Sequence, residues 1–305
     1  MFLVTSANGN QGKLLVPKLL AANVPLRALV RTEESGAYLR GLGVDVIVGD
    51  MGEPGIFERA MQGVTSVYHI GPVLDPHERE VGIAAIDAAR AAGVRHFVYS
   101  SVLHAIITDL VQHEIKRDIE EYLLASGLEF TILQPANYMF PLKLIPAFRD
   151  QVFRLSWSLD RLQSMVDLDD ITDVALEVLT NGERHYGATY ELVGRGRYDA
   201  YQLGAIISNV IGETVHVEQI GPDAYLKAQM GDRDPAPFAH LQKGLRAMTA
   251  RYSAHDFVGN SNVLTWLLGR EPTSFEQFVE RRHRLYLANN AATGPQPEAG
   301  VEVGK

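Results

Sequence analysis

Short apolar segments alternate with helical segments through the first half of this 305-residue chain. The apolar segments are rich in Val, Ile and aromatic residues, which predicts buried β-strands in FLVT, PLRALV, VDVIVG, SVYHI, RHFVYS and FTILQ. The stretches between them predict helices over Gly12–Ala22, Gly55–Gln62, Glu78–Ala92 and roughly Gln112–Ser126. This order of elements predicts an α/β fold, a doubly wound parallel sheet of the Rossmann type with helices on both faces.

The second half of the chain is less regular and mostly helical. ATYELVG predicts a strand, and helices are predicted in DLDDITDVALEVLT, YDAYQLGAIISNVIG, NVLTWLLG and TSFEQFVERRHRLYL. We therefore expect a Rossmann domain over residues 1–150 and a smaller, mostly helical region over 151–288 that is partly interleaved with the sheet. Residues 289–305 are rich in Pro, Gly and Ala and have no apolar periodicity, so a disordered tail is expected there.

Composition argues against several classes of function. The net charge is −9 and no cluster of Lys or Arg stands out, so neither nucleic acid nor an anionic membrane is expected as a partner. The chain has no Cys, which excludes disulfides, thiolate metal sites and Cys nucleophiles. HEIKR begins like a zinc-protease helix, but Arg117 stands where the second His is needed, so no metal is expected. The first residues lack the basic segment and apolar run of a secretory signal, and we expect a cytoplasmic protein.

The turn SANGNQG directly follows the first predicted strand and directly precedes the first predicted helix. This is where dinucleotide-binding proteins bind a pyrophosphate. Gly9 would let the backbone approach the phosphates, Gly12 would let the helix pack against the strand, and the amides at the helix start would bind the anion. The first glycine of the usual pattern is replaced by Ser6, a small residue, and we expect a working variant. The residues assigned to cofactor binding here are Ser6, Asn8, Gly9, Asn10, Gln11 and Gly12.

Two further strand ends predict the other half of the cofactor. The second strand ends at Arg31, where an NAD-preferring site usually has Asp or Glu to bind the ribose 2′-hydroxyl. A guanidinium suits a 2′-phosphate, so NADP(H) is the predicted cofactor. The third strand ends in VGDM, where Asp50 could accept a hydrogen bond from adenine and Met51 could lie beside the ring.

These segments together resemble the NmrA-like group of atypical short-chain dehydrogenases/reductases, over most of Phe2 to about Leu287. The resemblance rests on SANGNQG, VGDM, VYHIGPV, AAGVRHFVYSSV, the Lys116–Gly127 helix with EFTILQPANYM, VDLDDITDVALEVLT and NVLTWLLGREPTSFEQFV. It implies that residues 1–150 bind NADP and that 151–288 bind substrate. It also implies a nicotinamide pocket lined by Ile70, Gly71, Pro72, Ser100, Ser101, Pro135 and Asn137. Gln134 replaces the Arg that the family carries before Pro135.

The resemblance also bears on catalysis. Short-chain dehydrogenases use Tyr-x-x-x-Lys, in which Tyr donates the proton and Lys lowers its pKa and holds the ribose. Lys116 matches the lysine, but Gln112 stands where the tyrosine is expected. A replacement acid would have to be Lys116 itself, or one of His113, His104 and Tyr138. A roomy apolar substrate site is indicated by Tyr138, Phe140, Phe153 and Trp157.

Three functions fit this sequence. The first is an NADP(H)-dependent reductase of a carbonyl, quinone or imine in a small aromatic or apolar molecule, and the apolar C-terminal half favours it. The second is a redox sensor that binds NADP and regulates a partner without turnover, which the missing tyrosine fits. The third is a tailoring enzyme that uses the cofactor fold for isomerisation or cyclisation. A homodimer is left open.

Overall fold

The computed structural model describes residues 1–73, 75–230 and 239–293. By their internal contacts these residues form two compact units. Unit 1 consists of Met1–Pro135, Leu168–Leu192 and Asn262–Arg270, and unit 2 consists of Ala136–Asp167, Val193–Ser261 and the chain from Glu271 onward. The chain therefore passes between the units five times.

Unit 1 is built on a seven-stranded sheet in which every pair of neighbouring strands is parallel. Its spatial order is β10 (Ala188–Leu192), β6 (Phe130–Pro135), β5 (His96–Ser100), β4 (Ser66–His69), β1 (Phe2–Val4), β2 (Leu26–Val30) and β3 (Asp45–Val48). The chain builds outward from β1 to β3 and then returns to β4 on the other side of β1. The strand order thus reverses between β1 and β4, which is where open α/β sheets bind ligands. The predicted Rossmann-type sheet is confirmed.

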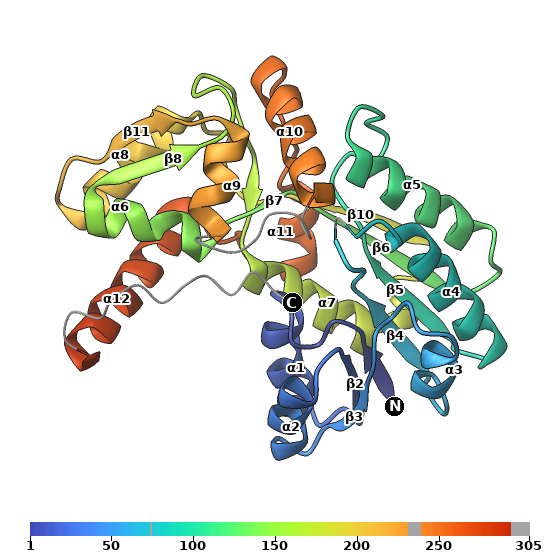
Figure 1. The fold of residues 1–305 in the computed structure, drawn as a ribbon. Coiled ribbons are helices and arrows are strands. Elements are labelled where there is room, and N and C mark those ends of the chain that lie inside the picture. Colours follow the sequence, from blue (N-terminus) through green and yellow to red (C-terminus); the bar gives the residue numbers. More distant parts are fainter. Residues whose placement is uncertain (74, 231–238, 294–305) are drawn as a thin grey trace. The chain divides into compact units, whose positions relative to one another are not determined.

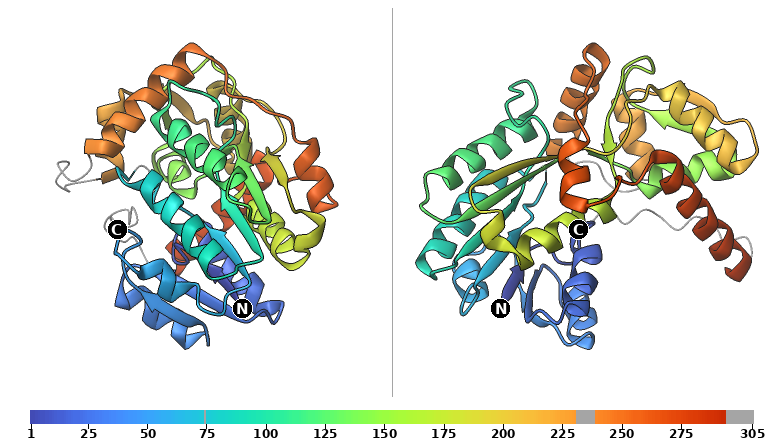
Figure 2. Two further views of the ribbon diagram at one scale, coloured as in Figure 1. Left: turned by 90° about the vertical axis from the view of Figure 1, so that its right-hand side faces the viewer. Right: turned by 180° about the vertical axis from the view of Figure 1, so that it is seen from behind.

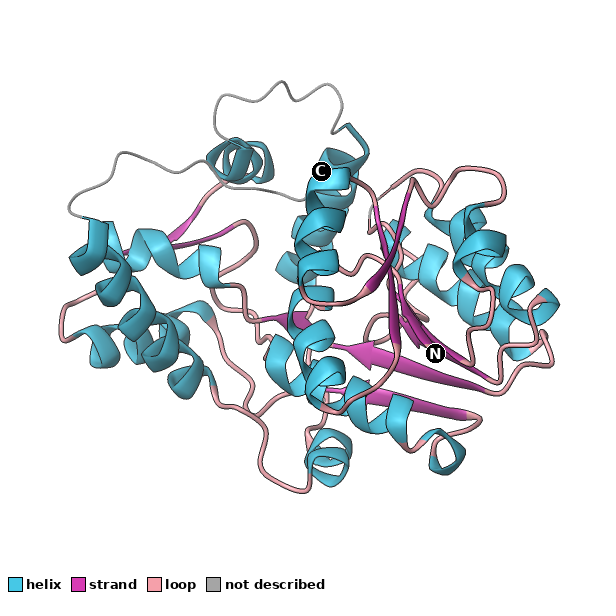
Figure 3. Ribbon diagram, turned by 90° about the horizontal axis from the view of Figure 1, so that it is seen from below, coloured by secondary structure: helices cyan, strands magenta, loops and turns pink. Residues whose placement is uncertain are grey.

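Helices cover both faces of this sheet (Figures 1 and 3). One face carries α3 (Ile56–Ala60), α4 (Glu78–Ala91) and α5 (Val111–Leu124), and α4 contacts both of its neighbours. In the left view of Figure 2 these helices lie in front of the strands. On the other side α1 (Gly12–Ala21) packs against α7 (Leu168–Thr180), which contacts β4, β5 and α11 (Asn262–Leu268).

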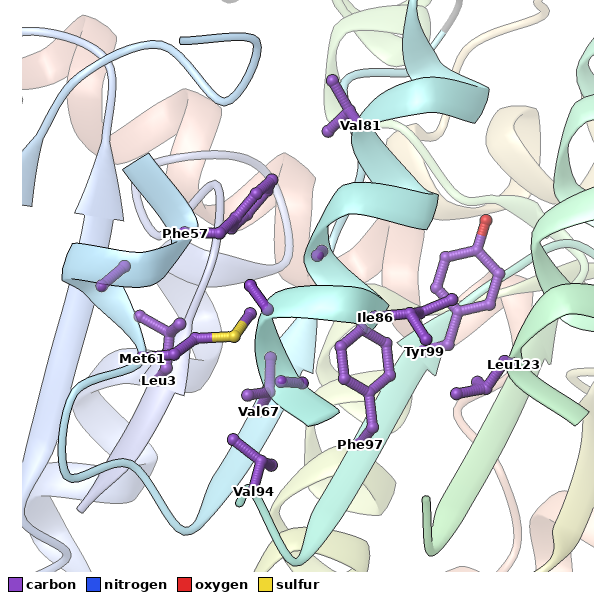
Figure 4. Packing of buried hydrophobic residues seen from close by; sticks show 14 of the residues in the cluster. Leu3, Phe57, Met61, Val67, Val81, Ile86, Val94, Phe97, Tyr99 and Leu123 are labelled. Atoms are coloured by element: carbon purple, nitrogen blue, oxygen red, sulfur yellow. The ribbon is translucent and has the colours of Figure 1, made fainter. Parts of the chain in front are cut away.

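One hydrophobic core cluster of unit 1 lies between the sheet and the helices α3, α4 and α5. Figure 4 shows strand side chains meeting side chains from these helices; the labelled ones include Leu3, Val67, Phe97, Tyr99, Phe57, Met61, Ile86 and Leu123, all at most 3% exposed. Helices α4 and α5 approach closely at Gly82, where a Cβ atom would lie 2.6 Å from Cδ1 of Ile119. This close packing fixes the start of α4 beside α5.

One helix of unit 1 was not predicted. Helix α2 (Glu33–Gly41) begins at Thr32, whose hydroxyl accepts a hydrogen bond from Ser35 N at 3.3 Å. It contains Gly36, and glycine disfavours a helix. At this position, however, a Cβ atom would lie only 3.0 Å from a methyl of Val48 on β3. Close packing on the strand, invisible in the local sequence, outweighs the low helix propensity.

Unit 2 contains helices and two small pairs of parallel strands. The strand pairs are β7 (Asn137–Tyr138) with β9 (Met165–Val166), and β8 (Val152–Leu155) with β11 (His216–Gln219). Its helices are α6 (Ile145–Asp150), α8 (Ala200–Ile211), α9 (Pro222–Met230), α10 (Ala239–Ala254) and α12 (Phe275–Thr293), with a 3-10 turn η1 (Pro141–Leu144); a second turn, η2 (Gly182–Arg184), belongs to unit 1. Of the predicted tail, residues 289–293 continue α12 and 294–305 lie outside the described residues. None of the helices described is long and apolar enough to cross a membrane.

Candidate functional site

The turn after β1 lies at the point where the strand order reverses. Ser6 adopts a left-handed backbone conformation with φ of +46°, which normally favours glycine. A Cβ atom on Gly9 would lie 3.1 Å from the Ser6 carbonyl oxygen, which is tight. On Gly12 a Cβ atom would lie 2.5 Å from the backbone of Ala7, a distance too short for any residue with a side chain unless the backbone moves. Gly12 is therefore the glycine that lets α1 start against β1, and Ser6 holds the backbone shape of the glycine that it replaces.

Hydrogen bonds tie this turn to the end of β4. The Thr5 hydroxyl accepts from Ile70 N at 2.8 Å, and both it and the Ser6 hydroxyl donate to Ile70 O at 3.0 Å. The Gln11 side chain points into the interior, where it donates to the Ser100 hydroxyl at 2.9 Å and accepts from Tyr68. The side chains of Ser6 and Gln11 are thus used inside the protein, and only their backbone groups remain to bind a cofactor. Asn10 is exposed at the start of α1.

The residues predicted to bind the adenine end of the cofactor lie at the ends of β2 and β3. Arg31 is exposed and makes no side-chain hydrogen bond or ion pair with the part of the chain that the structure describes. Asn8 of the glycine turn donates to the Ser35 hydroxyl at 2.7 Å, which joins the turn to the start of α2 directly after Arg31. Asp50 is exposed and accepts from Gly52 N at 2.8 Å, whereas Met51 packs partly against the core.

Lys116 lies in the interior, at the ends of β4 and β5. Its ammonium is 2.8 Å from Oε1 of Glu78, donates to Ser100 O at 3.2 Å and lies 5.2 Å from the centre of the Tyr99 ring. The Lys116 side chain is 6% exposed and that of Glu78 is fully buried. A Cβ on Gly71 would be 3.7 Å from the ammonium and 3.2 Å from Glu78, so the loop after β4 passes directly over this ion pair. Sequence reasoning missed Glu78, because nothing local distinguishes it from a solvated acid at a helix start.

The other candidate acids in unit 1 differ in how they are placed. His113 is buried, and its Nδ1 is 2.9 Å from His104 O, which fits a packing role better than an exposed acid. His104 has a positive φ of +57° and a partly exposed ring 3.4 Å from Glu191. Gln112 is buried on α5, one turn before Lys116.

A second acid that sequence reasoning missed is Glu120, one turn after Lys116. It accepts from the Ser101 hydroxyl, and from Gln134 Nε2 at 2.8 and 3.0 Å. Burial raises the pKa of Glu120 despite these hydrogen bonds. The spacing of positions 112, 116 and 120 puts all three on one helix face, and this was the signal that could have found it. Gln134 therefore serves as a neutral donor to Glu120.

The predicted aromatic residues belong to unit 2. Tyr138, Phe153 and Trp157 line one pocket whose walls come from unit 2 alone. Phe140 packs edge-on against Tyr138, with 5.5 Å between the ring centres. Pro135 is the last residue of β6, and Asn137 donates to Gln163 at 2.9 Å inside unit 2.

The chain matches the NmrA-like family over residues 1–278. It belongs to this family. It is 33% identical over 255 residues to the (4-alkanoyl-5-oxo-2,5-dihydrofuran-3-yl)methyl phosphate reductase of Streptomyces griseus. This alignment covers 82% of this chain and 88% of the relative. The chain is 28% identical over 288 residues to the NAD(P)H azoreductase of Xenophilus azovorans, covering 92% and 97%. The solved NADPH-dependent quinone oxidoreductase of Escherichia coli, complexed with NADPH, has the same fold, with a TM-score of 0.79, 24% identity and coverage of 92% and 99%.

This NmrA-like chain departs from the family pattern at two positions where the structure supplies the reason. Ser6 adopts the left-handed backbone conformation of the turn, and its hydroxyl donates a hydrogen bond to Ile70 O, directly after β4. Gln134, in place of Arg, bonds to Glu120 without a formal charge. Both substitutions leave the switch point between β1 and β4 intact.

Proposed function

We propose that this NmrA-like protein is an NADP(H)-dependent reductase that acts on a carbonyl, quinone or imine of a small organic molecule without a tyrosine proton donor. The observation that carries the proposal is the cradle at the switch point: a left-handed turn at Ser6, and a Gly12 that no side chain could replace without moving the backbone. Such a turn at the start of a ten-residue helix suits a pyrophosphate.

The choice of NADP(H) is supported by Arg31. Its guanidinium has no partner among the described residues and stands one position before the residue that caps α2. A bidentate bond to a 2′-phosphate would satisfy it, whereas a free 2′-hydroxyl would leave its charge unpaired.

When bound, NADPH supplies a hydride to the acceptor. The acceptor atom bonded to the attacked carbon would then need a proton. We give the buried Lys116, paired with Glu78, the role of holding the ribose side and polarising this part of the site. Ser101 and Glu120 would supply this proton, because a carboxyl whose pKa is raised by burial can pass a proton on through the serine hydroxyl. In this proposal Lys116 orients the reactants, and Ser101 with Glu120 supplies the proton.

The relatives support the class of reaction. The curated relatives are named as a reductase of a dihydrofuranyl methyl phosphate and as an azoreductase, and the solved neighbour as a quinone oxidoreductase. Azo groups and quinones are electron-poor conjugated groups, which accept a hydride readily. An acceptor of this kind needs little acid catalysis, so a site without tyrosine can serve it.

The test is a panel of quinones, ketones and imines with NADPH and NADH, followed by the nicotinamide absorbance. We expect oxidation of NADPH by quinones above all, and a preference for NADPH that Arg31→Ala reduces about ten- to a hundredfold. Arg40→Ala is the matched control, because Arg40 on α2 is exposed like Arg31 and forms a surface ion pair with Glu33. Equal affinity of the unmutated protein for both cofactors would contradict the assignment of Arg31. Tight NADP binding without turnover of any acceptor would favour the sensor instead.

A further inference from the structure

The pocket of unit 2 is small and has mostly apolar walls. Its lining includes Phe153, Leu155, Trp157, Met165 and Tyr198. Its empty volume is about 390 Å³ including the open mouth. The enclosed part is narrow, with room for a water molecule or for one terminal group of a larger molecule. The pocket therefore fits the end of a ligand rather than a whole ring system.

A chain of hydrogen bonds fixes the orientation of Gln163 at this pocket. Burial raises the pKa of Tyr252, so its hydroxyl keeps the proton and donates to Asn137 Oδ1 at 3.4 Å. Asn137 Nδ2 then donates to Gln163 Oε1 at 2.9 Å. The backbone of Gln163 is held by two bonds to Tyr198, at 2.9 and 3.0 Å. The amide of Gln163 consequently presents its NH₂ group as the unused end.

Two buried donors of this lining have no acceptor among the described residues. They are Nε2 of Gln163 and Nε1 of Trp157, in side chains of residues that are 3% and 6% exposed. Buried N–H groups are nearly always hydrogen-bonded in native proteins, because leaving one unpaired costs the loss of its hydration. Both donors belong to residues that line the same pocket. The missing acceptor is therefore expected from a molecule bound there.

The charged groups of the lining are both cations. The ammonium of Lys143 lies 5.0 Å from the centre of the Trp157 ring and makes no ion pair with the described residues. Arg161 donates from Nε to Ser253 O at 3.3 Å, and its Nη1 is 3.9 Å from Asp256, a long ion pair. No Asp or Glu is present among the lining side chains that the structure describes. In a protein of net charge −9 this is a local positive site.

We propose that this pocket binds an oxyanion group, a carboxylate, sulfonate or phosphate, carried by an aromatic or conjugated ligand. Gln163 and Trp157 donate hydrogen bonds to its oxygens, Lys143 and Arg161 balance its charge, and the apolar walls contact the adjoining carbon skeleton. The assignment of the ligand as the hydride acceptor rests on the proposed function; the binding of the anion does not.

The experiment compares two probes that differ in charge, naphthalene-2-sulfonate and the neutral naphthalene-2-sulfonamide, by calorimetry. NADP⁺ is present at saturation so that its phosphates occupy the site on unit 1. We expect the sulfonate to bind at least tenfold more tightly, and Lys143→Gln and Gln163→Leu each to remove about tenfold for the sulfonate alone. Lys227→Gln is the matched control, because Lys227 is exposed in unit 2 and lies outside the pocket lining.

A second measurement locates the bound probe. The chain has two Trp residues, and Trp266 is 74% exposed on α11 of unit 1. In protein labelled with 5-fluorotryptophan, the two ¹⁹F signals are assigned with Trp266→Phe. We expect the sulfonate to shift the Trp157 signal and leave the Trp266 signal in place.

Equal binding of the two probes, or an unshifted Trp157 signal, overturns the proposal and leaves the pocket as a site for water. An affinity for the sulfonate that is unchanged in both Lys143→Gln and Gln163→Leu overturns the proposal as well. If the protein binds the sulfonate at Trp157 but reduces no acceptor, the proposed anion site stands and the proposed reductase function is refuted. If neutral and sulfonated naphthoquinones are reduced at the same kcat/KM and the two probes bind equally, the proposed reductase function stands and the proposed anion site is refuted.

Discussion

The ion pair between Glu78 and Lys116 gives the sharpest prediction. Glu78→Gln removes one charge and keeps a side chain of nearly the same shape. The ammonium of Lys116 then stays buried without a carboxylate beside it and keeps its hydrogen bond to Ser100 O at 3.2 Å. Removing one partner of a buried pair costs about 3–5 kcal/mol, since an uncompensated charge stays out of water. The amide oxygen of Gln can still accept a hydrogen bond, so we expect the lower end, about 3 kcal/mol.

The same two helices supply a matched control at the surface. Arg79 of α4 is 2.7 Å from Asp118 of α5, and their side chains are 37% and 30% exposed. Because exposed pairs contribute about 0–1 kcal/mol, Asp118→Asn should change the free energy of unfolding by less than 1 kcal/mol. Urea unfolding followed by far-UV circular dichroism measures both variants. A loss for Glu78→Gln no larger than that for Asp118→Asn would refute the reasoning, because the pair would then be solvated.

A double-mutant cycle with Lys116→Met links this pair to function. With both charges removed, the double variant should be more stable than the sum of the two single losses predicts. In turnover with NADPH and a quinone, we expect Lys116→Met to weaken cofactor binding and to lower kcat by a factor of about 10². An unchanged Michaelis constant and an unchanged kcat, in a folded variant, would remove Lys116 from the site.

Three further predictions concern unit 1. Ser6→Gly should change the free energy of unfolding by no more than about 1 kcal/mol and keep the affinity for NADP, because relief of the left-handed backbone strain offsets the lost hydrogen bond to Ile70. Calorimetry with NADP⁺ measures the affinity. A large loss of affinity would show that the Ser6 hydroxyl binds the cofactor. Gly12→Ala should cost about 1–3 kcal/mol in urea unfolding and weaken NADP binding, since its Cβ would meet the Ala7 backbone at 2.5 Å; unchanged values would contradict the close approach. Burial lowers the pKa of His69 from 6.5 to about 3, so its contribution to stability is complete above pH 6.5 and is lost as the pH falls toward 3. His69→Leu should therefore reduce the fall in the free energy of unfolding between pH 7 and pH 5 by about 2 kcal/mol, and the same pH slope in both proteins would argue against a neutral His69.

The sheet of unit 1 could be predicted because its central strands, such as β4 and β5, are buried on both faces. Such strands are continuous apolar runs, and each lies next to a glycine or polar turn that marks its end. The predicted strands in PLRALV and RHFVYS are observed as β2 and β5 within one residue of these limits. The strands of unit 2 could not be predicted in this way. Pairs such as β7 with β9 are two residues long, too short for any period to appear in the sequence.

The turn between β1 and α1 was also predictable, because a turn between a strand and a helix is a local feature. The partners of its polar side chains were not. Whether Gln11 faces a ligand or the interior depends on Tyr68 and Ser100, which only the folded sheet brings beside it. In the same way, the sequence around Glu78 is that of an ordinary acid in the first turn of a helix. Only the packing of α4 on α5 buries its side chain away from water.

These partners bear on the missing tyrosine. Gln112 lacks the acidity of a phenol, so in the proposed reductase any proton that a developing oxyanion takes up must come from another group. The same face of α5 carries Glu120 two turns further on, joined to Ser101 at the end of β5. A carboxyl held there with a raised pKa is most active as an acid below neutral pH, so proton supply through Ser101 requires turnover to fall as the pH rises. Glu120→Gln should abolish that pH dependence and lower kcat, while a sensor without turnover has no such profile to lose.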